Sequence, residues 1–278
     1  MEKRIDLHVH STYSDGTLTP TELVTLAVKR NLCAFALTDH DTTDGLPEAI
    51  IAARTKQIEL ISGIELSCNY HGKEIHIVGL GIEYEHISFV DTLSEFKTLR
   101  DCRNKKMIKK LQDAKIDISY EQMFSTFGNI IWTRAHFAKY LQTHGYVAQM
   151  WDAFPRYIGD GAPCFVPKEN ITPYQVIKLI HENNGYAILA HPLLYHYTTS
   201  ELDTLVYELS KLGIDGLEAI YSSNHYMDES NMKLLAHKYH LKISGGSDYH
   251  GANKPNIQLG TGKGNVNIPY YIWKDLCS

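Results

Sequence analysis

Residues 33–42 read CAFALTDHDT, a short apolar run that ends in two carboxylates and an imidazole. An apolar run of this length, bounded by polar residues, is typical of a buried β-strand. Its end carries Asp39, His40 and Asp41, and barrel enzymes hold their catalytic groups at this end of the strands. The segment therefore predicts an α/β fold with a site at one end of its sheet.

The alternation of strand and helix patterns continues outward from this segment in both directions. Strand patterns lie at residues 4–7, 34–38, 59–64, 75–80, 186–190, 216–220 and 242–245. Helical patterns lie at residues 20–31, 47–55, 173–183, 201–212 and 229–240. Pro20 and Pro173 suit the first turn of a helix and support two of these boundaries. Seven βα-like units predict a distorted (β/α)7 barrel.

Residues 89–166 interrupt this alternation, because no strand pattern survives there. Amphipathic helical runs occupy residues 92–111 and 134–143, and the aromatic stretch MWDAFPRYIG follows at residues 150–159. We interpret the region as a helical insertion that selects the substrate, within one barrel domain formed by residues 1–88 and 167–278. The aromatic residues around Trp151 could stack a base, but we expect them to fill the insertion's own core, as aromatic residues of a small helical unit usually do.

The charge and the N-terminal residues limit the partners and the location. A formal net charge of −5 over 278 residues disfavours a broad basic surface for duplex nucleic acid, while a small or single-stranded anionic substrate stays compatible. The start, MEKRID, is charged and lacks the apolar segment of a signal peptide or membrane span. We expect a cytoplasmic protein without membrane contact. Five scattered cysteines form no CxxC pair and fit reduced thiols.

Histidine and carboxylate residues recur where the predicted strands end. His8 and His10 are two residues apart on a strand and so project to the same face. An HxH pair alone is more often a packing or surface feature, but here the pattern repeats at strand after strand. The recurring residues are His8, His10, Asp15, His40, Glu65, His76, His191, Asp248 and His250. Imidazole and carboxylate ligands without thiolate suit manganese, iron or zinc and do not select among them.

Six segments together resemble the PHP (polymerase and histidinol phosphatase) family of metal-dependent phosphoesterases. They read DLHVHSTYSDG (6–16), LTDHDTTDG (37–45), GIELS (63–67), EIHIVGL (74–80), ILAHP (188–192) and GGSDYH (245–250). The wording TDHDTTDG and the central insertion resemble the branch that hydrolyses 3′,5′-bisphosphonucleotides and trims short RNA from the 5′ end. The resemblance implies a phosphoric ester hydrolase acting on a nucleotide or on short single-stranded RNA.

The resemblance also implies two to three divalent transition metal ions and a metal-bridged hydroxide as nucleophile. The first ion would be held by His8, His10, Glu65 and Asp248. The second would be held by Glu65, His76 and His191, and the third by Asp15, His40 and His250. Glu65 would thus bridge two ions, and with Asp248 and His191 it is expected to carry catalysis.

Three cationic or imidazole side chains are candidates for binding the substrate phosphate. Arg134 lies in the stretch WTRAHF, which resembles the family's phosphate-binding segment R-P-H-F-A except for Ala135 in place of proline. A guanidinium fork matches phosphate oxygens in geometry and charge. Lys168 and His225 are weaker candidates.

Three alternative functions stay open on the sequence alone. The first is a phosphatase for a small metabolite such as histidinol phosphate. The second is an inactive metal-binding PHP module, against which the intact ligand set argues. The third is a hydrolase of C–N bonds, since barrel amidohydrolases also begin with HxH, although they usually add a lysine bridge where Glu65 stands here. The oligomeric state does not follow from the sequence.

Overall fold

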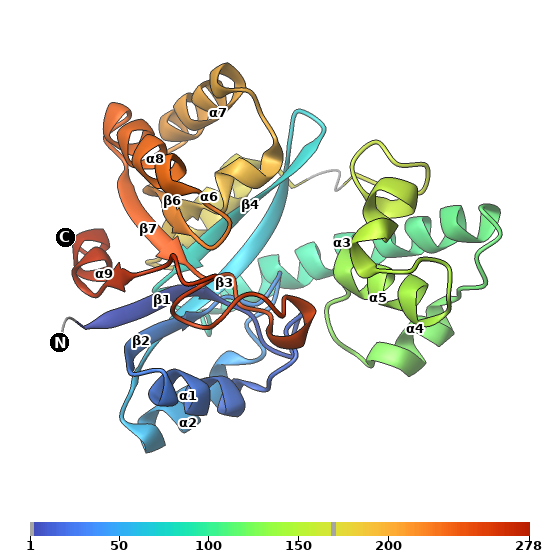
Figure 1. The fold of residues 1–278 in the computed structure, drawn as a ribbon, viewed down its shortest axis with the longest axis horizontal. Coiled ribbons are helices and arrows are strands. Elements are labelled where there is room, and N and C mark those ends of the chain that lie inside the picture. Colours follow the sequence, from blue (N-terminus) through green and yellow to red (C-terminus); the bar gives the residue numbers. More distant parts are fainter. Residues whose placement is uncertain (1–2, 168–170) are drawn as a thin grey trace.

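The computed structural model describes residues 3–167 and 171–278. Its strands form one eight-stranded sheet in the order β7-β6-β5-β4-β3-β2-β1-β8 (Figure 1). The strands are β1 (Arg4–Val9), β2 (Leu32–Leu37), β3 (Glu59–Tyr70), β4 (Lys73–Leu80), β5 (Tyr186–Leu189), β6 (Gly216–Tyr221), β7 (Lys242–Gly246) and β8 (Ile268–Pro269). The first seven lie at the seven predicted places, and β8 is an addition that the sequence patterns did not indicate.

The direction of β4 differs from the predicted repetition of strand and helix. β4 runs antiparallel to both β3 and β5, while the pairs β1–β2, β2–β3, β5–β6 and β6–β7 are parallel. β3 and β4 form a hairpin whose turn contains His71 at φ 49° and Gly72 at φ 86°. Two successive residues of positive φ are typical of the tight turns that join antiparallel strands. β3 is therefore joined to β4 by a hairpin turn and not by a helix.

The barrel is almost closed by contacts between β1 and the segment that follows β7. The peptide N–H of His10 donates to the carbonyl of Tyr249 at 3.0 Å, and that of Asp248 donates to the carbonyl of His8 at 2.9 Å. At the other end of β1, Arg4 and Ile5 pair with β8. The predicted distorted α/β barrel is thus confirmed, with seven strands at the predicted places, β8 in addition, and closure at the end where the histidines lie.

Helices cover the outside of the barrel (Figure 1). They are α1 (Pro20–Lys29), α2 (Leu46–Lys56), α6 (Pro173–His181), α7 (Thr199–Lys211), α8 (Tyr226–Lys238) and α9 (Tyr271–Leu276). Thr19, Thr172 and Thr198 each begin a helix with a capping box, which satisfies N–H groups that the first turn leaves unpaired. None of the helices in the described ranges is long and apolar enough to cross a membrane.

The segment between β4 and α6 forms a helical unit beside the barrel (Figure 1). It contains α3 (Ile87–Asp113), α4 (Tyr120–Phe127), α5 (Arg134–Thr143), the 3-10 turn η1 (Met150–Asp152) and the π-helical turn η2 (Phe154–Ile158). Helix α4 was not predicted. The unit has its own apolar cluster, which includes Met107, Phe137 and Ile158. The first turns of α3, with Phe89 and Leu93, instead pack into the cluster of the barrel and its helices.

Helix α3 consequently packs against both the barrel and the helical insertion. Its 27 residues span about 40 Å at 1.5 Å per residue. Midway along it, the buried Arg100 binds the barrel through Asp41 and through the hydroxyl of Ser67 at 2.9 Å. One turn on, the Arg103 Nε–H donates to the carbonyl of Val166 at 3.0 Å in the insertion. The division at residue 89 stays a prediction, because the helix is continuous there.

Candidate metal centre

Predicted ligands from six different segments meet at one end of the barrel. His8 is the penultimate residue of β1, which ends at Val9, His10 follows the strand directly, and Asp15 lies in the turn beyond it. His40 follows β2, His191 follows β5, and Asp248 and His250 follow β7. All of these side chains are buried. The carboxyl ends of parallel strands lie at one end of a barrel, so the strand-end rule places these seven residues.

Glu65 and His76 reach the same place through the β3–β4 hairpin. Glu65 lies in the middle of β3, which continues past the mouth of the barrel to Tyr70. Because β4 runs the opposite way, its first residues lie at the mouth, and His76 is its fourth residue. Ser67 pairs with His76 and Glu65 with Val78, so Glu65 and His76 are diagonal neighbours on one face of the hairpin.

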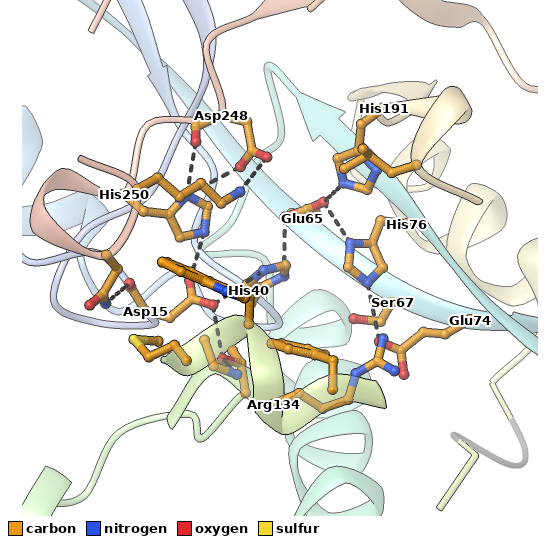
Figure 2. A pocket seen from close by; sticks show the side chains of 18 of the residues that line it. Asp15, His40, Glu65, Ser67, Glu74, His76, Arg134, His191, Asp248 and His250 are labelled. Atoms are coloured by element: carbon orange, nitrogen blue, oxygen red, sulfur yellow. Dashed lines mark hydrogen bonds and ion pairs between the residues drawn. The ribbon is translucent and has the colours of Figure 1, made fainter. Parts of the chain in front are cut away.

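The Glu65 carboxylate lies at the centre of the cluster, as Figure 2 shows. Its Oε2 atom lies within 3.2 Å of a ring nitrogen in each of His8, His10 and His40. Its Oε1 atom lies 2.8 Å from His76 Nδ1 and 2.9 Å from His191 Nε2. The two oxygens therefore face two different sets of imidazoles, which is the arrangement needed to bridge two positions.

Several polar atoms of the cluster are buried without a hydrogen-bond partner in the described part of the chain. They are His8 Nε2, His10 Nε2, His40 Nδ1, Asp15 Oδ1 and His191 Nδ1. The three ring nitrogens of His8, His10 and His40 lie near Glu65 Oε2 without forming a hydrogen bond. A buried polar atom that lacks a hydrogen bond costs about 1–3 kcal/mol, so five in one cluster require an explanation. Coordination of metal ions would satisfy these atoms, and the donor set of imidazoles and carboxylates fits manganese, iron or zinc.

Neighbouring imidazoles of the cluster have opposite pKa shifts. Burial lowers the pKa of His40 to about 3. Burial also lowers the pKa of His10, but the carboxylates of Asp248 and Glu65, 3.4 and 3.2 Å from its Nε2 atom, outweigh burial and raise the pKa to about 9. The rings of His10 and His40 are only 4.7 Å apart. Such close rings destabilise one another when charged, and neutral imidazoles are what metal ions bind.

Four groups of side chains place their ligand atoms within 4.8 Å of one another. The groups are His10, Asp15, His40 and His250; His8, His10 and Asp248; His8, Glu65 and His191; and His40, Glu65 and His76. The group with Asp15 contains the whole predicted third set and adds His10. The other groups overlap the first and second sets without reproducing them. The nine residues are thus brought together, while their division among individual ions stays a prediction.

Glu218 on β6 supports the cluster from outside and was missed by the sequence analysis. It is 2 % exposed, and it accepts hydrogen bonds from His8 Nδ1 at 3.0 Å and from the His191 peptide N–H at 2.6 Å. With the proton of His8 on Nδ1, the lone pair of Nε2 points into the cluster. A carboxylate inside the apolar stretch GLEAIY is the same signal that singled out Glu65.

Asp248 is held in place by residues that the sequence did not indicate. Its Oδ2 atom accepts from Lys254 Nζ at 2.6 Å and from the Tyr221 hydroxyl at 2.7 Å. Its backbone has φ 54°, and that of His191 has φ 28°. Residues other than glycine rarely adopt positive φ, and such strain concentrates at functional sites. Lys254 lies in a loop and has no pattern around it that would have revealed its role.

A cavity of about 390 Å³ opens onto the cluster from the side of the insertion. Arg134 lies in its wall and reaches toward Glu74, as Figure 2 shows. The Arg134 guanidinium lies 3.2 Å from Glu74 and 2.8 Å from Asp160. Glu74 also lies 3.2 Å from His76 Nε2, so a buried carboxylate connects the arginine to the cluster. Lys254 lines the same cavity.

The other two predicted substrate contacts have different outcomes. Lys168 lies outside the described residues. His225 is exposed and does not line the cavity, because it begins helix α8, where its peptide N–H donates to Asp228 at 2.8 Å. The geometry therefore does not bring His225 to the cluster.

The PHP domain family matches residues 6–191 of the chain. The chain belongs to the PHP family. A 5′-3′ exoribonuclease of Haemophilus influenzae is 39% identical over 90% of this chain and 91% of its own length. A 3′,5′-nucleoside bisphosphate phosphatase of Chromobacterium violaceum is 32% identical over 98% of this chain and 96% of its own length.

A solved structure agrees with this PHP fold over almost the whole chain. It is described as an amidohydrolase from Chromobacterium violaceum with bound sulfate and no metal, and it superposes with a TM-score of 0.87 at 32% identity. The similarity covers 98% of this chain and 95% of the other. The comparisons confirm the predicted family, and at the level of that family they confirm the prediction of a metal-dependent phosphoester hydrolase.

Proposed function

We propose that this PHP protein hydrolyses phosphate esters of nucleotides, either 3′,5′-bisphosphonucleotides or the 5′ ends of short single-stranded RNA. One observation carries the proposal: a single cavity joins the His and carboxylate cluster to the guanidinium of Arg134 and the ammonium of Lys254. Metal ligands alone would suit many hydrolases. The addition of two cations beside them favours an anionic substrate, and phosphate in particular.

We propose two to three divalent ions, of manganese, iron or zinc, held by the nine clustered residues. Such ions generate a nucleophile from water at neutral pH and neutralise charge on a phosphoryl group. Glu65 would bridge two of them, because its two oxygens face different imidazole sets. Its neighbours keep it ionised: burial would raise its pKa, but His40, His8 and His76 outweigh burial and hold the pKa well below the usual value.

Arg134 would bind and orient the substrate phosphate. Burial would lower its pKa, but Glu74 and Asp160 outweigh burial and raise the pKa, so the side chain stays charged at every working pH. Glu74 and Asp160 fix two edges of the guanidinium, which offers five N–H donors in a rigid fork. The remaining donors are available to a phosphate that is bound at the cluster.

A second phosphate or the next nucleotide of an RNA would meet the other cations of the site. Lys254 is the described candidate, because its ammonium group lines the cavity beside Asp248. Lys168 remains a proposed contact. A relative that acts on nucleoside bisphosphates and another that acts on RNA both have substrates with more than one phosphate position.

The alternative of C–N bond hydrolysis has one observation in its favour, the description of the similar solved structure as an amidohydrolase. The geometry favours phosphate instead, since Glu65 is shared by two of the candidate ligand groups and Arg134 lines the cavity. An inactive module is a weaker alternative, because all nine predicted ligands are present and clustered.

The test compares substrates on one preparation of known metal content. We expect kcat/KM for adenosine 3′,5′-bisphosphate or a short 5′-phosphorylated RNA to exceed that for histidinol phosphate by at least about a hundredfold. The variant Glu65→Gln should abolish every activity, which excludes a contaminating phosphatase. A preference for histidinol phosphate would overturn the nucleotide assignment, and amide hydrolysis without phosphate release would overturn the phosphoesterase.

A further inference from the structure

The three tryptophans of the chain have different surroundings. Trp132 is 4% exposed, and its ring packs against Tyr120 at a centroid distance of 4.8 Å. Trp273 packs against Tyr186 at 6.1 Å. Trp151 is 69% exposed and yet lines the cavity above the metal centre. The expectation that Trp151 would fill the insertion's core was therefore wrong.

The backbone that carries Trp151 is fixed. Trp151 is the central residue of η1, which begins with a capping box in which the Gln149 N–H donates to Asp152 at 3.0 Å. Ala153, the residue that follows η1, is fully buried in the insertion's apolar cluster, and so is Ile158 at the end of η2. The indole is thus held on an anchored turn, and its exposure is not that of a loose loop.

Three apolar neighbours line the cavity together with this indole. Met150 and Phe154 come from the same turns of the insertion, and Leu194 comes from the barrel. The Leu194 N–H donates to the carbonyl of His191 at 2.9 Å, so this leucine lies one turn from a predicted metal ligand. We call Met150, Trp151, Phe154 and Leu194 the apolar wall. The cavity therefore has a charged end at the cluster and an apolar wall.

We propose that the apolar wall, with Trp151 as its main surface, binds the base of a nucleotide by stacking. The inference rests on the proposed function, since it requires a substrate whose phosphate is held at the cluster. A cavity of about 390 Å³ is of the size that holds small-molecule ligands and exceeds the needs of a single phosphate. An exposed tryptophan beside such a site is typical of nucleic-acid binding by stacking.

The composition of the wall also determines how selective the stacking is. Apart from the indole N–H and the weakly accepting sulfur of Met150, its side chains carry no hydrogen-bonding group. Bases are distinguished by hydrogen bonds to their edges, whereas every base offers a flat face for stacking. The wall therefore binds bases in general and does not select one of them.

The experiment measures what the base contributes to turnover. The substrates are adenosine 3′,5′-bisphosphate and an abasic analogue that keeps the sugar and both phosphates. We define the base factor as the ratio of their kcat/KM values, and we expect a base factor of about 5 to 150 in the wild-type protein. In Trp151→Ala the base factor should fall close to one.

Two further variants separate stacking from a general loss of structure. Trp151→Phe keeps an aromatic face and should keep most of the base factor. Tyr271→Ala removes another exposed aromatic side chain, which is 61% exposed. Tyr271 belongs to α9, and Figure 1 shows α9 on the far side of the barrel from α5. This control should leave the base factor unchanged.

A wild-type base factor in Trp151→Ala would overturn the inference and leave the proposed function intact. A preference of more than about a hundredfold for one of the four bases would overturn the unselective wall, because stacking alone gives only modest preferences. Failure of the wild-type protein to hydrolyse either substrate would overturn the proposed function and this inference with it.

Discussion

Removal of Glu218 should weaken metal binding although Glu218 is not itself a predicted ligand. The carboxylate is 2% exposed and accepts from His8 Nδ1 at 3.0 Å and from the His191 N–H at 2.6 Å. Glu218→Ala leaves both donors buried without this partner, and each such donor costs about 1–3 kcal/mol. It also frees His8 to place its proton on Nε2, which would block coordination.

Part of the effect of Glu218→Ala should appear as a loss of metal affinity. Loss of a carboxylate that orients a ligating histidine typically lowers metal affinity about 10- to 100-fold, which corresponds to about 1.4–2.7 kcal/mol. We expect the isosteric variant Glu218→Gln to lie between the wild type and Glu218→Ala. Its amide oxygen can still accept one of the two hydrogen bonds, while its NH₂ group faces the other donor.

The assay is a competition titration of manganese and of zinc against a fluorescent chelator, with the melting temperature measured on the metal-free proteins. Glu208→Ala is a matched control, because Glu208 accepts from the Tyr70 hydroxyl at 2.8 Å and has no contact with the cluster. Wild-type metal affinity in Glu218→Ala would refute the reasoning. So would an affinity loss of the same size in the Glu208 variant.

Three further predictions concern the centre and its surroundings. Glu65→Ala should lose more than one equivalent of metal by elemental analysis and Asp15→Ala about one, whereas a single ion insensitive to Glu65 would contradict the bridge. Arg134→Ala should lower kcat/KM roughly thirty- to a thousandfold at unchanged metal content, which corresponds to about 2–4 kcal/mol of lost transition-state stabilisation. Unaltered turnover would contradict the role of Arg134 in binding phosphate. Gly246→Ala should lower the free energy of unfolding by about 1–3 kcal/mol or more, because the added Cβ would lie 2.1 Å from the Cβ of His8; wild-type thermal stability would contradict this clash.

The sequence predicted the strands and the clustered residues because both follow from local rules. An apolar run that ends in histidine or aspartate indicates the position of a strand and of its end, and parallel strands bring such ends together. Glu65 was recognised as an ionisable residue in an apolar strand. The same pattern at Glu218 was not recognised. A carboxylate that hydrogen-bonds ligating histidines from outside has the same sequence pattern as a metal ligand, so the pattern does not distinguish the two roles.

Features that depend on tertiary packing were beyond this reasoning. The direction of β4 follows from the turn at His71 and Gly72, where the sequence pattern alone indicated only two neighbouring strands. Trp151 was expected in the insertion's core because large aromatic residues usually supply apolar area there. In the structure Ala153 and Ile158 fill that role, and the choice among the residues of MWDAFPRYIG is made by packing.

The continuity of α3 bears on how substrate preference could be exchanged between PHP proteins. Arg134 and three of the four wall residues follow α3 within the insertion, while Leu194 belongs to the barrel. The hydrogen bonds of Arg100 and Arg103 tie α3 to the barrel on one side and to the insertion on the other. A chimaera joined within α3 would cut this double attachment. One joined at the loops after Leu80 and before Pro173, so that α3 travels with its insertion, should carry the recognition of the leaving group into a new catalytic barrel.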